Sequence, residues 1–160
     1  MRIAIYHNLP SGGGKRALHE MTMRLVARHH MDVFSLSCAE HSFCDLRPFA
    51  VRTVIEPFAA RPMLRSPFGR LNQLIRIANW ERLDAVDRRI AAQIDGGGYD
   101  AVFVHHCQYR QSPGVLRFVK TPSIYFIHEP PRWIYEPPAR TESPLPWRRV
   151  LNAVDPLPAL

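Results

Sequence analysis

Residues 2–17 read RIAIYHNLPSGGGKRA, and this segment carries the clearest signals of the fold. Residues 2–7 are rich in β-forming side chains, and residues 8–11 contain the Asn, Pro and Ser that are typical of a turn. The three glycines at 12–14 then open a segment in which apolar side chains over residues 18–26 recur at helical spacing. The stretch therefore predicts a strand, a glycine turn and a helix that ends near His29 or His30.

The rest of the chain continues this alternation of strands and helices. A long helical pattern without internal Pro or Gly runs over residues 69–95 and ends at three glycines, and Ser112-Pro113 begins a short helix that ends near Lys120. Four further β-rich runs lie at residues 32–37, 51–55, 101–104 and 123–127. Strands that alternate with helices predict an α/β domain with a doubly wound parallel sheet of the Rossmann type. We expect this domain to cover residues 1–137, followed by a Pro-rich tail at 138–160.

Composition narrows the class of protein. The chain has 160 residues, 46% of them hydrophobic, which suits one packed domain. Charged residues interrupt every apolar run before the roughly 20 residues that a membrane-spanning helix needs. The N-terminus also lacks the apolar stretch and cleavage site of a signal peptide, so we expect a cytoplasmic protein. The three cysteines form no close pair, which favours free thiols.

The net charge of +7, carried almost wholly by arginine, favours an anionic partner. Arg61, Arg65, Arg70 and Arg76 lie in and before the long helix among apolar residues, a pattern that suits an acidic membrane surface as well as a solvated basic face. We expect no nucleic-acid partner.

The loop Ser11-Gly12-Gly13-Gly14-Lys15 has the chemistry of an anion site. Glycines let backbone N–H groups approach a phosphate or sugar at the positive end of a helix. The loop is not a Walker A sequence, because Arg16 stands where that motif needs Ser or Thr, and it fits a dinucleotide fingerprint only in the form that ends with Ala17. A tight turn without a ligand remains the alternative.

Histidines lie at the ends of two predicted strands. His128 and Glu129 follow the fifth strand, and His105 follows the fourth, where side chains can reach a ligand at the carboxyl edge of the sheet. The sequence His105-His106-Cys107 does not predict a metal site, since neighbours on an extended chain point to opposite faces and no second ligand cluster is present.

Three segments resemble the N-terminal domain of family 4 (group 1) glycosyltransferases of the GT-B fold. They are residues 1–36 with the glycine loop, the run Tyr-Asp-Ala-Val-Phe-Val-His at 99–105, and Ile127-His128-Glu129-Pro130 within residues 122–137. In that family two Rossmann-like domains face each other across a cleft. The C-terminal domain holds the nucleotide sugar, and the chain stops at Leu160, about where the linker to that domain would begin.

The resemblance implies a retaining hexosyltransferase that uses neither metal nor cofactor. It implies that this half recognises a sugar or lipid-linked acceptor, and that as a fragment it is inactive on a nucleotide-sugar donor. It assigns His128 to catalysis and Gly12, Gly13 and Gly14 to the donor side of the cleft. We add Lys15, His105 and Glu129 as substrate-binding candidates and expect the protein to lie in the cytoplasm, with peripheral contact to the inner face of the membrane.

Two other functions fit the same elements. A non-catalytic Rossmann-like module could bind a phosphorylated ligand through the glycine loop. A nucleotide-dependent oxidoreductase fits less well, because such enzymes place an acidic residue at the end of the second strand to hold a ribose, and here the first acid is Glu40.

Overall fold

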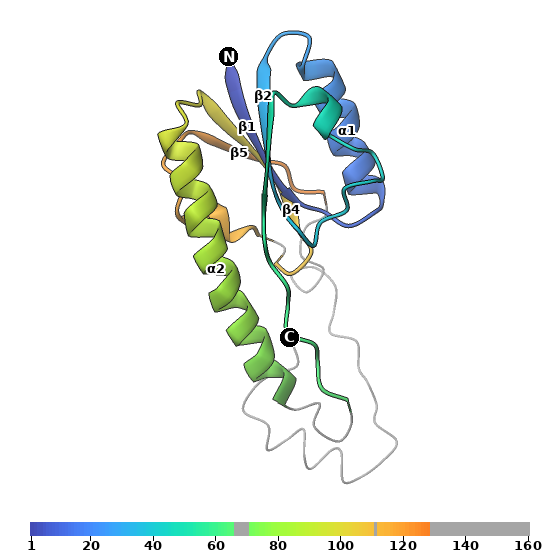
Figure 1. Ribbon diagram of the computed structural model, residues 1–160, viewed down its shortest axis with the longest axis vertical. Coiled ribbons are helices and arrows are strands. Elements are labelled where there is room, and N and C mark those ends of the chain that lie inside the picture. Colours follow the sequence, from blue (N-terminus) through green and yellow to red (C-terminus); the bar gives the residue numbers. More distant parts are fainter. Residues whose placement is uncertain (66–70, 111, 129–160) are drawn as a thin grey trace. The chain divides into compact units, whose positions relative to one another are not determined.

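A parallel sheet of five strands forms the centre of the described part of the chain (Figure 1). The computed structural model describes residues 1–65, 71–110 and 112–128. The strands follow the order β3-β2-β1-β4-β5, with every neighbouring pair parallel. They are β1 (Arg2–Asn8), β2 (His30–Leu36), β3 (Arg52–Glu56), β4 (Ala101–Cys107) and β5 (Ser123–Tyr125). The predicted Rossmann-like α/β class is confirmed.

Helices cover both faces of the sheet. In Figure 1, α1 (Gly13–Leu25) lies on one side and α2 (Asn72–Gly96) on the other. Two single turns of 3-10 helix, η1 (Arg47–Phe49) and η3 (Gly114–Arg117), complete the described elements. The predicted tail, residues 138–160, and the stretch before it from Glu129 lie outside the described residues.

Several predicted element ends were wrong, including that of β4, which continues past Val104 to Cys107. Helix α1 stops at Leu25 because the N–H of His30 already donates to the carbonyl of Met1, 3.0 Å away, and this bond starts β2. The segment after Ser112 forms only η3, whose bonds run from residue i+3 back to residue i, as from Phe118 N–H to Val115. Strand β5 ends at Tyr125, two residues early.

Two apolar layers hold the helices on the sheet. Side chains alternate along β1, so Ala4 and Tyr6 pack toward α2 while Ile5 packs toward α1. Leu83 and Ile90 of α2 are fully buried in the larger layer. Burying a side chain of this size contributes roughly 1.5–3 kcal/mol, which is why the short strands are stable.

Strand β4 carries a bulge near its carboxyl end. Tyr6 pairs with Val104 and Asn8 pairs with Cys107, so β4 spends three residues where β1 spends two. Because of this extra residue, Cys107 packs in the layer under α2, as Val104 does, whereas His105 contacts Phe103, which packs against the layer under α1. The strict alternation of faces assumed for this part of the sequence therefore fails after His105, and bulges of this kind often lie beside functional sites.

Helix α2 is longer than the sheet beneath it. Its 25 residues span about 37 Å, whereas a strand of seven residues spans about 23 Å. The first buried residue of the helix is Asn79, so its first two turns extend beyond the carboxyl edge of the sheet, as Figure 1 shows. No helix in the described parts of the chain is both long and apolar enough to cross a membrane.

Candidate ligand site at the carboxyl edge of the sheet

The strand order places a switch point between β1 and β4. From β1 the chain moves through α1 to β2 on one side, and β4 continues to β5 on the other. In sheets of this kind the loops that leave the two strands diverge, and ligands bind in the resulting crevice at the carboxyl ends. The glycine loop follows β1 and the histidines of residues 105 and 106 end β4, so both flank this crevice.

The glycine loop begins α1 without any side-chain cap. Gly12 has φ 153° and ψ −169°, a backbone conformation that side chains other than glycine's rarely adopt. Its carbonyl accepts the first helical bond from Arg16, and no acidic residue lies in the first turn. The N–H groups of this turn therefore have no side-chain acceptor and carry the positive end of the helix dipole.

The structure brings the glycine loop and His128 together, as we expected from their strands. A Cβ atom placed on Gly14 would lie 3.5 Å from the imidazole ring of His128. A Cβ on Gly13 would meet nothing within 4 Å. The two glycines thus differ, because Gly14 supports the histidine while Gly13 faces open space.

His128 is held in place by His105. The Nδ1 atom of His105 and the Nε2 atom of His128 are 3.1 Å apart, so one donates and the other accepts. Phe126 packs edge-on against the ring of His128 at 5.0 Å and Phe103 against that of His105 at 4.3 Å. These contacts fix both rings, and they make His105 a positioning residue rather than one that faces a ligand.

His105 stays neutral at the end of β4. Burial, and then the charges of His128, His106 and Lys15, together lower its pKa to about 3. Its Nε2 atom has no hydrogen-bond partner among the described residues. A neutral, fully buried imidazole can fix the orientation of its partner without adding a charge to the site.

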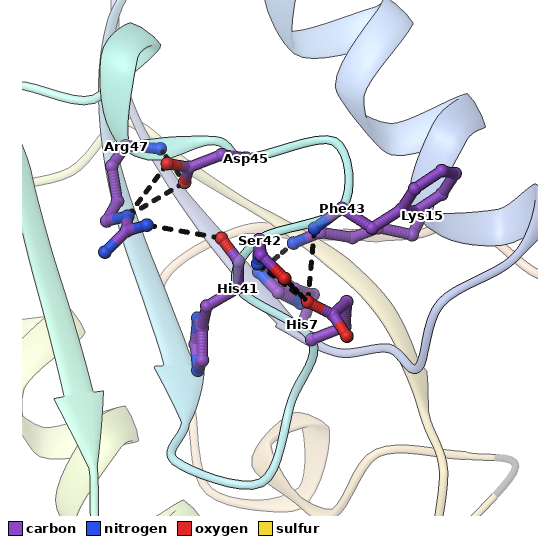
Figure 2. A network of polar contacts seen from close by, with 8 residues as sticks. His7, Lys15, His41, Ser42, Phe43, Asp45 and Arg47 are labelled. Carbon is purple, nitrogen blue, oxygen red and sulfur yellow. Dashed lines mark hydrogen bonds and ion pairs between the residues drawn. The ribbon is translucent and has the colours of Figure 1, made fainter.

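Lys15 points inward, contrary to the simplest expectation for a substrate-binding lysine. Its side chain is 1% exposed, and its Nζ atom lies 3.2 Å from the Nε2 atom of His7 (Figure 2). An ammonium group only donates, so His7 accepts through Nε2 and is neutral. Burial, and then the charge of Lys15, lowers the pKa of His7 well below its ordinary value.

The charge of Lys15 is only partly balanced. Burial lowers its pKa to about 8, while Asp45, Cys44 and Glu40 act in the opposite direction. No carboxylate of the described residues lies within ion-pair distance of its amine. A buried cation without a direct counter-charge, close to the glycine turn, favours an anion in the crevice.

The loop after β2 supplies the carboxylates near Lys15, which our sequence analysis missed. Glu40 accepts hydrogen bonds from the hydroxyl and N–H of Ser42 and from the N–H of Phe43, and these bonds lower its pKa to about 2. Asp45 pairs with Arg47 at 2.9 Å (Figure 2). Only the folded loop brings these residues to Lys15, so no spacing in the sequence could have revealed them.

A hollow of about 490 Å³ opens beyond β2 and β3, on the side of α2. Its lining includes the buried side chains of Phe58 and Val86 and the exposed Arg82 and Arg89. Arg89 reaches Glu56 at 3.4 Å, whereas Arg82 has no ion pair among the described residues. The size suits a small organic ligand, and the arginines favour one with an acidic group.

The other sequence predictions concern Glu129, metal binding and the cysteines. Glu129 lies outside the described residues, and the described ones contain no group of three His, Cys, Asp or Glu side chains that could hold a metal ion. All three cysteines are free, and the carboxamide of Asn8 contacts the sulfur atoms of Cys38 and Cys107.

Topology alone defines the class of this protein as a Rossmann-like α/β domain. No protein-family model matches the chain, and no curated protein matches it. Among solved structures it is similar to the C-terminal domain (residues 78–226) of PF1911 hydrogenase from Pyrococcus furiosus, with 14% identity and a TM-score of 0.46. The match covers 78% of this chain and 88% of that chain. A similarity of this size carries no argument about function.

Proposed function

We propose that this chain is the acceptor-side domain of a retaining glycosyltransferase. The observation that carries the proposal is the contact of the glycine turn with His128, because it joins an anion-binding backbone and a hydrogen-bonding imidazole at the switch point of the sheet. The resemblance of the glycine loop and the strand before His128 to family 4 enzymes supports the same reading.

In the proposed reaction the acceptor hydroxyl forms a bond to the anomeric carbon of the donor sugar. The bond from that carbon to the diphosphate breaks, the nucleoside diphosphate leaves with the electron pair, and the hydroxyl proton passes to the diphosphate or to solvent. The N–H groups at the start of α1 would stabilise the negative charge that grows on the diphosphate. The buried charge of Lys15 acts on the same charge through its field.

His128 would bind a sugar hydroxyl near the reacting carbon. His105 limits the ring to one orientation, and its low pKa keeps the pair from carrying two charges at neutral pH. Orienting one hydrogen-bonding group in advance is worth roughly a hundredfold to a thousandfold in rate at sites that stabilise charge. The hollow at Arg82 and Arg89 is where we place an acidic or phosphorylated part of the acceptor.

The test is transfer of labelled sugar by a protein in which this domain is joined to a nucleotide-sugar-binding domain. We expect His128→Ala to lower kcat about a hundredfold in a protein that still folds, with a loss of about 1–3 kcal/mol in the free energy of unfolding because buried His105 loses its hydrogen-bond partner. We expect Gly13→Val to obstruct the donor, whereas Gly96→Val, at another glycine with open space around it, leaves transfer intact.

The alternative function gives a different result. If the chain is a non-catalytic module for phosphorylated ligands, pyrophosphate will shift the backbone amide resonances of Gly12, Gly13 and Gly14, but no nucleotide sugar will be turned over. Unchanged transfer in both His128→Ala and Gly13→Val would contradict the proposed site. The 160-residue chain alone is expected to transfer no sugar.

A further inference from the structure

Strand β3 is the last strand of the sheet on the side of β2, and no described strand lies beyond it. The N–H of Val51, just before β3, donates to the carbonyl of Met31 in β2 at 2.8 Å. The direction of hydrogen bonding alternates along a strand, so the N–H groups of Thr53 and Ile55 also point to β2, whereas the N–H and carbonyl of Val54 point to the open edge. An open row of backbone groups is a template on which a further strand can pair.

The sequence of β3 is self-complementary when two copies run antiparallel. It reads Arg52-Thr53-Val54-Ile55-Glu56. When Val54 of one copy lies opposite Val54 of the other, Arg52 of each copy lies opposite Glu56 of the other. Edge strands that avoid pairing commonly carry charges such as lysine, because like charges placed opposite each other repel a second copy. The charges of β3 are opposite in sign and equally distant from Val54, so they attract one.

The backbone groups of β3 fit the same register. Antiparallel pairing centred on Val54 lets the two Val54 residues exchange both of their outward bonds, and lets the N–H of each Glu56 donate to the carbonyl of the other copy's Arg52. It leaves without a bond between the copies only the N–H of Arg52 and the carbonyl of Glu56. Both already have partners within the chain, because the N–H of Arg52 donates to the carboxylate of Asp32 at 2.9 Å and the carbonyl of Glu56 accepts from the N–H of Ser37 at 2.9 Å.

The charged side chains of β3 lie on one face of the sheet. Val54 packs against the layer under α2, and Arg52 and Glu56 share its face because they are two residues away. Arg52 is exposed and takes part in none of the ion pairs of the described residues. Glu56 is held by Arg89 at 3.4 Å and by Gln93 at 2.7 Å. It therefore presents a fixed carboxylate to which the guanidinium of the other copy can donate.

The apolar side chains of the opposite face are covered by the same pairing. Val51 and Ile55 are 76% and 43% exposed. In the antiparallel register Ile55 lies opposite Thr53 of the other copy and diagonally beside that copy's Ile55 and Val51, within reach of contact. Pairing therefore joins the exposed apolar side chains of both copies into one strip and removes part of their surface from water.

We propose that β3 is the interface of a symmetric dimer, in which two copies of this chain pair antiparallel about Val54 and form one sheet that continues through both copies. The two-fold axis passes between the two Val54 residues, so each copy uses the same surface. Because β2 separates β3 from the switch point between β1 and β4, the crevices of both copies stay open. This inference concerns association alone and holds whether or not the domain takes part in sugar transfer.

Sedimentation velocity of the full chain tests the dimer. A contact made by one short strand is small, so we expect the fraction of dimer to rise as the concentration increases from about 10 to about 500 μM. Arg52→Glu should weaken dimerisation about tenfold or more, because it replaces an attraction by a repulsion at both symmetric positions. The control Arg88→Glu makes the same change of charge on an exposed side chain that lies over Phe118, away from β3, and should leave the dimer unchanged.

Two charge variants together test the register. Arg52→Glu gives a chain with an acid at both positions, and Glu56→Lys gives a chain with a base at both. Each variant alone should dimerise more weakly than the wild type, whereas an equimolar mixture should form a heterodimer, because every acid then lies opposite a base. Circular dichroism should show that both variants are folded, since neither side chain is fully buried.

Amide hydrogen exchange in the wild type tests the same interface without any variant. The N–H groups of Val54 and Glu56 should exchange more slowly at high than at low protein concentration, because only the dimer gives them a partner at the open edge. The N–H groups of Thr53 and Ile55 point to β2 and should be protected at both concentrations, so they serve as the internal control.

Three outcomes would overturn the proposal. The first is a wild-type chain that stays monomeric at the highest concentration. The second is a dimer that Arg52→Glu leaves intact, or that Arg88→Glu weakens as much, since another surface or net charge alone would then govern association. The third is exchange of the Val54 and Glu56 amides that does not depend on concentration while the chain dimerises, which would place the interface elsewhere.

Discussion

The two faces of the sheet bury charges of opposite sign. On the side of α1, Lys15 lies beneath the glycine turn with His7 and His105. On the side of α2, the carboxyl group of Asp87 is fully buried and accepts a hydrogen bond of 2.6 Å from the hydroxyl of Tyr6. Tyr6 and His7 are neighbours in β1, so one strand separates the two groups.

The surroundings of the two groups differ, and only those of the basic groups are suited to a ligand. The basic groups are at the switch point, next to backbone N–H groups that have no side-chain acceptor. Asp87 is instead covered by Gly114, whose added Cβ would lie 2.5 Å from its Oδ2 atom, and burial raises its pKa to about 6. We therefore infer that the burial of Asp87 lowers the stability of the fold, whereas Lys15, His7 and His105 belong to the candidate site.

The largest expected effect on stability comes from a change at Gly114, which covers Asp87. Gly114→Ala would push a methyl group against Asp87, Arg110 and Asp84, all of which hold each other by hydrogen bonds or charge. Moving a buried carboxylate and its partners should cost about 2–4 kcal/mol in the free energy of unfolding, measured with urea. The control Gly13→Ala meets no atom within 4 Å and should change stability by about 0.5 kcal/mol or less. Equal effects of the two changes would contradict the packing described here.

Low pH should destabilise the protein because His7 and His105 are buried in their neutral form. The pKa values of His7 and His105 are lowered in the folded chain, so below the unfolded value of about 6.5 the unfolded chain binds protons that the folded chain does not. Stability then falls by about 1.4 kcal/mol per pH unit for each histidine. Asp87 acts oppositely between about pH 6 and 4, because its raised pKa makes the folded chain hold the proton.

Urea unfolding at pH 7.5, 6 and 5 checks this balance. We expect a net loss of about 1.4 kcal/mol per unit below pH 6 in the wild type, and a steeper loss of about 2.7 kcal/mol per unit in Asp87→Asn, which lacks the opposing carboxyl group. Stability that stays constant from pH 6 to 5 in both proteins would mean that the histidines are not held neutral.

The sequence predicted the elements better than the site. Runs of β-forming side chains and helical patterns placed all five strands and both long helices, because each reflects a local conformational preference. The contact of the glycine loop with His128 also followed from the sequence, since parallel strands bring their carboxyl ends to one edge.

What the sequence did not predict depends on contacts between distant residues. The bulge in β4 comes from its register against β1, and it places Cys107 on the face of the sheet opposite to that of His105. Nothing near Lys15 in the sequence indicates that its amine turns inward to His7. The hydrogen bonds of Asn79 to Arg61 and of Asn72 to Leu64 likewise form only when residues 61–65 lie beside α2.

The smallest expected effect tests how far the charge of Lys15 lowers the pKa values of His7 and His105. Lys15→Met keeps the length and apolar stem of the side chain but removes the charge, and this charge lowers the pKa of His7 and, less strongly, that of His105. We expect both pKa values to rise, and that of His7 to rise more than that of His105. The ammonium group lies 3.2 Å from the Nε2 atom of His7, whereas for His105 it has the smallest effect of the neighbouring charges. Titration of the imidazole C–H resonances by NMR would measure both. Burial, the largest cause for each histidine, is unchanged, so both should still titrate below their ordinary value, and stability at pH 7.5 should change by about 1 kcal/mol or less. Lys120→Met, an exposed lysine after η3, is the control and should leave both titrations where they are. If His7 titrates alike in Lys15→Met and the wild type, the charge of Lys15 does not reach the ring, and its proposed action on a bound diphosphate fails with it.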